Sequence, residues 1–295
     1  SKLPGESALR EKAELLEAEI RGLDDSLDKR VIELRSMLIE PLNLEKRVER
    51  VIISPAGQLN YVPFTILMQD KEIVYSPSGT IYGLLMEEQA KRGTKVFAIG
   101  NPAYTSKSRL ALLPETQQEV EAIGNVLLTK DKATKGNLLD ALKQEEQWRS
   151  VHFACHGLIN PNHPLHSSLA LTPDGDNDSG LFTCLDIFRQ NIHANLAVLS
   201  ACETAKGKVV KGEGIVGLTR AFMYSGTPGV ICSLWKVDDA ATRALMTRFY
   251  ETWNPKENSI DAATALKDAQ DFIRDQEKWK HPLYWAPWEL WGISK

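Results

Sequence analysis

The chain has 295 residues, of which 35 are basic and 39 acidic, and 43% of the residues are hydrophobic. These values are typical of a globular protein with one large domain, or one domain and a helical appendage, and exclude a disordered or fibrous chain. No dense stripe of basic residues indicates nucleic-acid binding, and no apolar run reaches the roughly 20 residues of a membrane span. We therefore expect neither nucleic acid nor membrane as a direct partner.

The cysteine content and the first residues bear on localisation. Four cysteines in a chain of this size favour free thiols in a reducing compartment over a disulfide framework. The start, from Ser1 to Gly5, lacks the charged and then apolar layout of a secretion signal. We predict a cytoplasmic protein, and the missing initiator Met leads us to expect a further targeting or regulatory segment upstream.

The first 41 residues carry the spacing of an amphipathic helix. Apolar residues alternate in steps of four and three, which marks one helix face: Leu16, Ile20, Leu23, Leu27, Val31, Leu34 and Leu38. We predict one long helix, or two, ending at Pro41 and packed on its own domain in preference to a coiled-coil dimer. Residues 1–41 then form a helical N-terminal extension and residues 42–295 the main domain.

The main domain begins with an apolar run at 51–53 and a turn at 54–57, and residues 59–67 suggest the second half of a hairpin-like pair. Further on, strand-like and helix-like segments alternate. Apolar runs predict strands at 96–100, 126–129, 151–154, 196–200 and 229–234. Helical patterns lie at 115–124, 138–147, 214–225 and 240–253, and Thr116-x-x-Glu119 predicts a capping box at the start of the first.

This alternation predicts an α/β fold with a mostly parallel sheet covered by helices on both faces, because crossover helices join parallel strands. In such sheets ligands bind at the carboxyl ends of the strands. Two strands end there in reactive side chains: one runs into His156-Gly157 and the other into Ser200-Ala201-Cys202. If the two strands are parallel neighbours, His156 and Cys202 meet.

A cysteine beside a histidine is a nucleophile, because the imidazole accepts the thiol proton and later donates a proton to the leaving amine. The predicted chemistry is acyl transfer, with Cys202 as the nucleophile and His156 as the base. The backbone amides of Gly157 and Cys202 are candidates for an oxyanion hole. The chemistry requires no cofactor or metal, and the residue that orients His156 is left open.

The motifs around these residues resemble the CHAT peptidases, relatives of caspases and separases. The matching segments stand in the order of that family: His156-Gly157, Ser200-Ala201-Cys202-Glu203-Thr204, Gly212-Glu213-Gly214, Ala221-Phe222-x-x-x-Gly226 and Ser233-Leu234-Trp235-Lys236-Val237-Asp238-Asp239. A closing segment, Pro282 to Trp288, extends the resemblance over roughly residues 42–295.

The resemblance implies a caspase-like three-layer αβα sandwich and a cysteine endopeptidase that acts on a protein substrate through a Cys202–His156 dyad. It also implies a mobile loop after the cysteine strand, for which Lys206 to Lys211 is the candidate. Relatives are commonly joined to TPR arrays or other sensor modules, so an upstream module or a regulatory partner is expected.

Asp238 and Asp239 follow the strand at 229–234, at the same edge of the sheet as the predicted dyad. Either carboxylate can form a pocket for a basic side chain, and the alternative is an N-cap for the next helix. Separases carry an Asp at the position of Asp239 and cut after Arg, which implies a preference for a basic residue before the scissile bond.

Other histidines and cysteines have simpler explanations. His152 starts its strand and is expected to be a hydrogen-bonded core or edge histidine, and Cys155, Cys184 and Cys232 are expected to be buried and inert. A zinc site from these residues with His163 and His166 is disfavoured, because no metal-ligand spacing is present and both of the latter fall in a loop-like stretch.

Two further patterns are not taken as sites. Gly212-x-Gly214-x-x-Gly217 does not directly follow its strand, which disfavours a dinucleotide site. Trp285, Trp288 and Trp291 are expected to pack the chain end onto the core. Two other functions stay open: a catalytically silent protein-binding module, and a redox or metal sensor that uses the same Cys and His residues.

Overall fold

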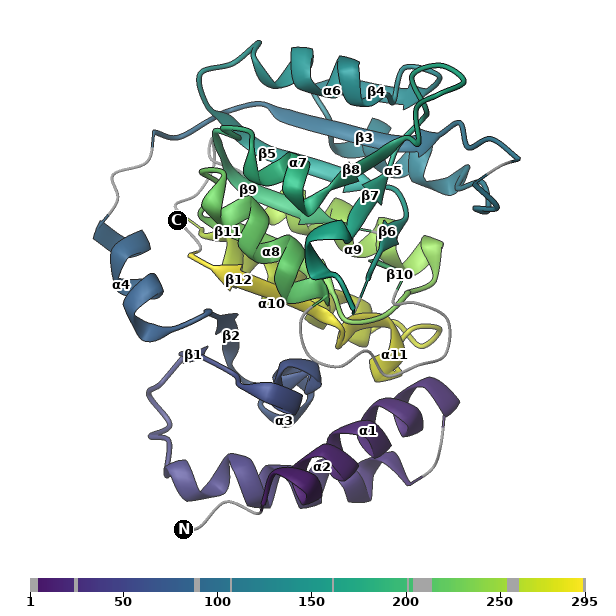
Figure 1. Cartoon of the computed structure of the whole chain (residues 1–295). Helices are drawn as coiled ribbons and strands as arrows, with labels where there is room; N and C mark the ends of the chain where they lie inside the picture. Colours follow the sequence, from purple (N-terminus) through teal and green to yellow (C-terminus); the bar gives the residue numbers. More distant parts are fainter. Residues whose placement is uncertain are drawn as a thin grey trace.

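The computed structural model describes residues 5–23, 26–87, 91–106, 108–160, 162–200, 202–203, 214–253 and 260–293. Its centre is an eight-stranded sheet with the order β1-β2-β12-β11-β9-β5-β3-β4 (Figure 1). The bounds of these strands, in the order of the sheet, are Arg50–Ile53, Glu72–Tyr75, Trp288–Gly292, Gly229–Ser233, Ala194–Leu199, Trp148–Ala154, Val96–Pro102 and Val126–Lys130.

Neighbouring strands of this sheet are parallel, with one exception. β11 and β12 are antiparallel, with Gly229 opposite Gly292 and Ser233 opposite Trp288. β12 in turn runs parallel to β2, and β2 parallel to β1. The sheet therefore consists of two parallel blocks of opposite direction that meet at the β11–β12 pair, and the predicted mostly parallel sheet is confirmed.

Helices cover both faces of the sheet. One face carries α5 (Glu115–Ile123), α9 (Asp239–Thr252) and α10 (Ala262–Arg274), which pack against one another and against the strands. The opposite face carries α7 (Cys184–Phe188) and α8 (Gly214–Tyr224), in front of the sheet in Figure 1, with α6 (Lys135–Leu142) beside β4. The layers form the predicted αβα sandwich.

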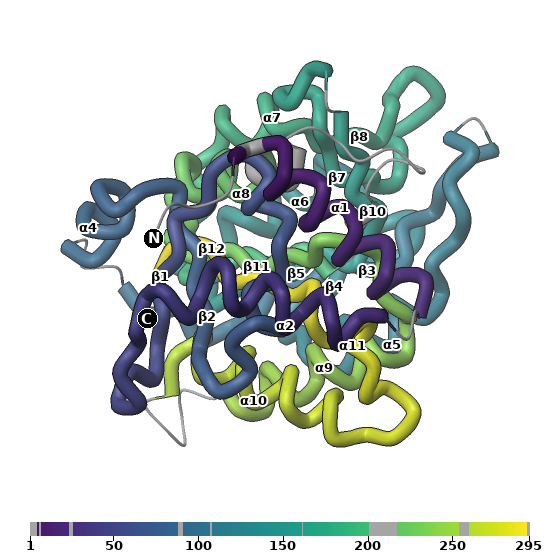
Figure 2. The backbone as a smooth tube through the Cα atoms, turned by 90° about the horizontal axis from the view of Figure 1, so that it is seen from below, coloured from purple at the N-terminus to yellow at the C-terminus, as the bar shows by residue number. Residues whose placement is uncertain are grey.

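The N-terminal segment folds as a hairpin of two helices, α1 (Glu6–Gly22) and α2 (Leu27–Leu38), followed by the short 3-10 helix η1 (Glu40–Leu42). α1 ends at Leu23, whose φ of 54° is left-handed and stops the helix. Apolar side chains from both helices, among them Leu16 and Leu34, are buried in the core. The hairpin lies across one end of the sheet (Figure 2), so the prediction that this segment packs on its own domain is confirmed.

The predicted hairpin-like pair at 59–67 is wrong. This stretch forms the 3-10 helix η2 (Gly57–Tyr61) and the short helix α3 (Phe64–Leu67), separated by Pro63. Proline has no amide hydrogen to donate to a strand ladder, which disfavours a strand at this point. β1 pairs instead with β2, a parallel strand that the sequence analysis did not predict. The exposed helix α4 (Gly79–Glu87) follows β2.

The predicted capping box at Thr116 is also wrong. The N-cap of α5 is Pro114, and Thr116 lies inside the helix, where its hydroxyl donates to the carbonyl of Leu113 at 2.7 Å. Glu119 does not reach back to an N-cap amide. It turns inward to the sheet, and this contact is described with the site.

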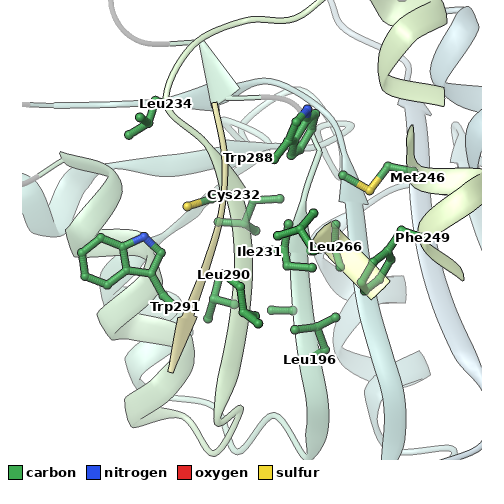
Figure 3. Packing of buried hydrophobic residues seen from close by; sticks show 14 of the residues in the cluster. Leu196, Ile231, Cys232, Leu234, Met246, Phe249, Leu266, Trp288, Leu290 and Trp291 are labelled. Carbon is green, nitrogen blue, oxygen red and sulfur yellow. The ribbon is translucent and has the colours of Figure 1, made fainter. Parts of the chain in front are cut away.

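The strand β12 is buried inside the central sheet, between β2 and β11. In Figure 3, Met246 and Phe249 of α9 and Leu266 of α10 lie on one side of the β11–β12 pair, and Cys232 and Trp291 on the other. Trp285, Trp288 and Trp291 are buried, with Trp285 in the short helix α11 (Pro282–Trp285). The predicted packing role of these tryptophans is confirmed.

A second, smaller sheet stands at the carboxyl ends of the central strands. It has the order β10-β6-β7-β8, with bounds Cys202–Glu203, Gly157–Leu158, Ser168–Ala170 and Leu181–Thr183. The 3-10 helix η3 (Pro164–His166) precedes β7. None of the helices in the described parts of the chain combines the length and hydrophobicity needed to cross a membrane.

Candidate active site

The two strands that carry the predicted dyad are parallel neighbours. β5 and β9 pair from Trp148 opposite Ala194 to Phe153 opposite Leu199. Beyond this register, the amide of Ser200 donates to the carbonyl of Phe153 at 2.9 Å. The carboxyl ends of both strands therefore lie side by side, as the sequence predicts.

The chain then continues from both strands into the small sheet. β10 pairs with β6 in parallel, with Cys202 opposite Gly157 and Glu203 opposite Leu158. Gly157 directly follows His156, so this register brings the backbone of Cys202 to within one residue of the histidine. The proximity that the strand pattern predicts is present in the backbone.

His156 is buried, with 2% of its surface exposed, and is held on several sides. Its backbone amide donates to the Tyr104 hydroxyl at 3.2 Å, and that hydroxyl donates to the carbonyl of Ala170, also at 3.2 Å. The backbone carbonyl of His156 accepts from the amide of Ala170 at 2.8 Å. The tyrosine ring packs beside the imidazole at a tilt of 40°, with 5.2 Å between the centroids.

The imidazole has an orienting partner. His156 Nε2 lies 2.8 Å from the backbone carbonyl oxygen of Ala111. A carbonyl oxygen only accepts, so Nε2 carries the hydrogen of this bond and Nδ1 is the basic nitrogen of the neutral ring. This tautomer is one that accepts a proton at Nδ1.

A buried network of side chains lies beneath the site. Glu119 of α5 accepts through one oxygen, Oε1, from Ser200 Oγ and from His152 Nε2, the latter at 2.9 Å. The other ring nitrogen of His152 lies 3.3 Å from the Tyr250 hydroxyl, which also bonds Ser150 at 2.8 Å. His152 is thus the hydrogen-bonded core histidine that the sequence predicts.

A cavity of about 20 Å³ opens at this edge of the sheet, between α5 and α9. That volume holds about one water molecule. Its lining comes from the ends of three strands and the starts of two helices: Leu113, Thr116, Glu119, His156, Ser200, Ser233, Lys236, Val237, Asp239 and Thr242. The cavity connects His156 with the buried carboxylate of Glu119 and with the segment after β11.

The two predicted pocket aspartates have different surroundings. Asp239 lines the cavity, and burial raises its pKa, aided by the nearby carboxylates of Asp238, Glu119 and Glu115 against the opposing Lys236 ammonium. Asp238 caps α9, where its carboxylate accepts from the amide of Ala241 at 3.0 Å. Asp238 is thus the N-cap of α9, the alternative that the sequence left open, and Asp239 lines the cavity.

The remaining cysteines and histidines lie apart from the dyad chemistry. Cys155, Cys184 and Cys232 are buried cysteines outside any disulfide, and burial raises the pKa of Cys184 to about 12. His163 and His166 are exposed, as expected for a loop. Within the described residues, no group of three or more His, Cys, Asp or Glu is arranged to hold a metal ion.

Two sequence predictions fall outside the described residues. The loop from Lys206 to Lys211 lies there entirely, as do Gly212 and Glu213 of the glycine pattern. Three contacts at the site escaped the sequence analysis: those of Tyr104, of the Ala111 carbonyl and of the Glu119 carboxylate. Glu119 had a visible signal, an acidic residue on the buried face of a predicted helix, which was interpreted as a cap.

Two solved structures align with this chain over most of its length. The structure of the Saccharomyces cerevisiae separase–securin complex aligns with a TM-score of 0.55 and 14% identity over 91% of this chain and 17% of that one. The Arg-specific cysteine proteinase gingipain R aligns with a TM-score of 0.51 and 10% identity, over 90% and 67% of the respective chains. The fold is therefore caspase-like.

Curated relatives are much longer proteins. Tetratricopeptide repeat protein 28 of Mus musculus is 27% identical over 239 residues, which cover 68% of this chain and 10% of the relative. The Homo sapiens protein of the same name is 24% identical over 303 residues, which cover 83% of this chain and 12% of the relative. This chain thus spans about a tenth of their length. The family model of the CHAT domain matches residues 29–292, and the chain belongs to the CHAT domain family.

Proposed function

We propose that this chain is a cysteine endopeptidase in which Cys202 attacks the carbonyl carbon of a peptide bond. The observation that carries the proposal is the parallel register of Cys202 with Gly157, which sets the backbone of the nucleophile beside the histidine. The caspase-like fold and the CHAT family membership support the same reaction. A nucleophile and its base are recognised by mutual geometry of this kind.

In the proposed reaction, Nδ1 of His156 takes the thiol proton and the Cys202 sulfur forms a bond to the carbonyl carbon. The amides of Gly157 and Cys202 stabilise the oxyanion, and the protonated imidazole gives its proton to the leaving amine as the C–N bond breaks. Water then hydrolyses the acyl-enzyme with His156 as the base. The hydrogen bond to the Ala111 carbonyl supports this role, because it stabilises the imidazolium that forms.

We further propose a preference for a basic residue before the scissile bond. Asp239 is the candidate partner, since its carboxylate lines the cavity beside His156 among other carboxylates. A cation there relieves the repulsion among these groups. The cavity is too small for an arginine or lysine side chain, so the proposal requires it to widen when substrate binds.

A protein partner or an upstream module is the proposed regulator, and the substrate is a protein. Support comes from the repeat proteins among the relatives and from the separase of known structure, which is in complex with securin. In this proposal residues 1–41 are the end of an upstream helical region and residues 42–295 the peptidase domain. The cysteine content favours the cytoplasm as the compartment.

The test is cleavage of a peptide library that varies the residue before the scissile bond, with wild type, Cys202→Ala and His156→Ala compared. We expect turnover in the wild type only, with Arg or Lys preferred. Turnover that survives in Cys202→Ala contradicts the proposed nucleophile. If neither this chain nor a longer one that includes the upstream segment cleaves any peptide, the silent binding module takes its place.

A further inference from the structure

We propose that Glu119 is a positioning residue, which holds the chain that carries Cys202 at a fixed distance from His156. This inference rests on the proposed function, because it concerns the geometry of the same dyad. Glu119 itself touches no reacting atom. It acts through Ser200, two residues before the nucleophile.

The first observation is where Glu119 makes its bonds. The side chain is 2% exposed and crosses from α5 to the carboxyl ends of the sheet strands. Its Oε1 accepts from Ser200 Oγ, at the point where the chain leaves β9, and from His152 Nε2 on β5. One carboxylate oxygen thus joins the two strands whose ends carry the dyad.

The second observation is what the same helix does for the histidine. The Ala111 carbonyl, three residues before the N-cap of α5, accepts from His156 Nε2 at 2.8 Å. The turn between them is pinned by Thr116, whose hydroxyl donates to the Leu113 carbonyl and accepts from the amide of Asn101 at 2.8 Å. The segment from Ala111 to Glu119 therefore contacts the base at one end and the nucleophile's chain at the other.

The third observation is how the described structure anchors Ser200. Its amide bonds the Phe153 carbonyl at 2.9 Å, and its hydroxyl bonds Glu119. Among the described residues that follow it, Cys202 is paired in β10, a strand of two residues. Loss of the hydroxyl bond removes one of the contacts that hold the chain between Ser200 and Cys202. A misplacement of roughly 1 Å can lower the rate of a catalysed reaction about 100-fold.

A purely structural role for Glu119 makes a different prediction. Buried His152 needs a partner for its Nε2 hydrogen, and Glu119 supplies one whether or not Ser200 is present. In that case the bond to Ser200 contributes to stability only. The two roles separate in Ser200→Ala, which removes the contact to the nucleophile's chain and leaves Glu119 and His152 in place.

The experiment compares wild type, Ser200→Ala, Ser200→Thr and Glu119→Gln for kcat and KM on the preferred peptide and for the rate of Cys202 alkylation by iodoacetamide. Ser225→Ala is the matched control, since this buried serine directly follows α8, donates to the Phe222 carbonyl at 2.9 Å and does not line the cavity. Thermal unfolding of every variant measures the structural cost.

We expect Ser200→Ala to lower kcat at least about tenfold, with KM within about twofold, and to slow alkylation of Cys202. Its loss of melting temperature matches that of Ser225→Ala, which keeps the wild-type kcat. Ser200→Thr retains the hydroxyl and restores most of kcat. Glu119→Gln, which keeps an acceptor oxygen, falls between wild type and Ser200→Ala.

Other outcomes overturn the inference. A wild-type kcat in Ser200→Ala, or an equal loss of kcat in Ser225→Ala, assigns Glu119 a structural role alone, while the dyad itself stands if Cys202→Ala and His156→Ala are inactive. If the wild type cleaves no peptide and His156→Ala does not change Cys202 alkylation, the proposed function fails and the positioning role fails with it.

Discussion

Cys202 and Gly157 are opposite residues of a parallel pair only two residues long. The large sheet aligns β5 with β9, but the small sheet sets the final approach of the backbone of Cys202, the proposed nucleophile, to that of His156, the proposed base. The proposed dyad thus depends on β6 and its neighbours as much as on the central strands. Changes that loosen the small sheet should reduce activity while the core stays folded.

Tyr104→Phe tests this dependence. The Tyr104 hydroxyl bonds the His156 amide and the Ala170 carbonyl, so it connects His156, the proposed base, to β7 of the small sheet. Its loss should lower the free energy of unfolding by about 1–3 kcal/mol, because both buried groups lose a partner, and should reduce kcat. Urea denaturation and peptide cleavage measure the two effects. Tyr224→Phe, at a tyrosine that is 76% exposed, is the control and should change neither.

Asp239→Asn tests the proposed pocket. Removal of the carboxylate charge should raise KM for peptides with Arg or Lys before the scissile bond and leave KM for uncharged residues unchanged. Asp238→Asn is the control, because Asp238 caps α9 and Asn is an equally good cap, so this variant should keep both selectivity and stability. Equal KM changes in both variants count against Asp239 as the specific partner of the substrate.

Glu289 predicts a stability that depends on pH. It is buried in β12, where it accepts from Trp291 Nε1 at 2.9 Å, and burial raises its pKa from 4.5 to about 8. Between these values the folded state holds a proton that the unfolded chain has released. Stability therefore falls as the pH rises through this window, by up to about 1.4 kcal/mol per pH unit.

Glu289→Gln should remove this dependence. Denaturation of both proteins at pH 5 and pH 8 measures the free energy of unfolding. From pH 5 to pH 8 the variant should lose less stability than the wild type. The control is Glu277→Gln, at a side chain that is 90% exposed, whose profile should follow the wild type. Parallel profiles for wild type and Glu289→Gln would show that the buried carboxyl is not the group that titrates.

The N-terminal hairpin is expected to unfold together with the sheet. Leu16 of α1 is fully buried in the common core, so Leu16→Ala should cost about 2–5 kcal/mol. Ile32→Ala, at a side chain of α2 that is 65% exposed, should change stability by less than about 0.5 kcal/mol. Calorimetry checks both values, and a separate early transition in Leu16→Ala would contradict a single cooperative unit.

The central strands and most helices could be predicted, because each contains an apolar pattern that is long enough to be recognised between the turn residues that flank it. The strands predicted at 96–100, 151–154 and 196–200 lie within β3, β5 and at the end of β9. Their alternation with helices sufficed to predict the parallel sheet and the adjacency of the backbones at His156 and Cys202. The apolar runs alone suffice to predict β5 and β9, the strands that lead to these two residues.

Other parts left no such pattern. β6 and β10 have two residues each, too few for any periodicity, so the sheet that pairs Cys202 with Gly157 was not foreseeable. The partner of His156 is the carbonyl of Ala111, and a backbone oxygen is supplied by every residue type. Glu119 was misassigned for a different reason: the capping-box spacing is local, whereas the carboxylate is engaged by His152 and Ser200, which are distant in sequence.

The place of β12 in the sheet bears on synthesis of the protein. This strand comprises residues 288–292, yet it stands between β2, formed by residues 72–75, and β11. Until it arrives, β2 and β11 each have an open edge, and the two parallel blocks of the sheet have no shared strand. During synthesis on a ribosome, the sheet that contains β1 and β2 therefore stays incomplete until residues 288–292 have left the exit tunnel. Chaperone contact and protease sensitivity should be greatest in that interval.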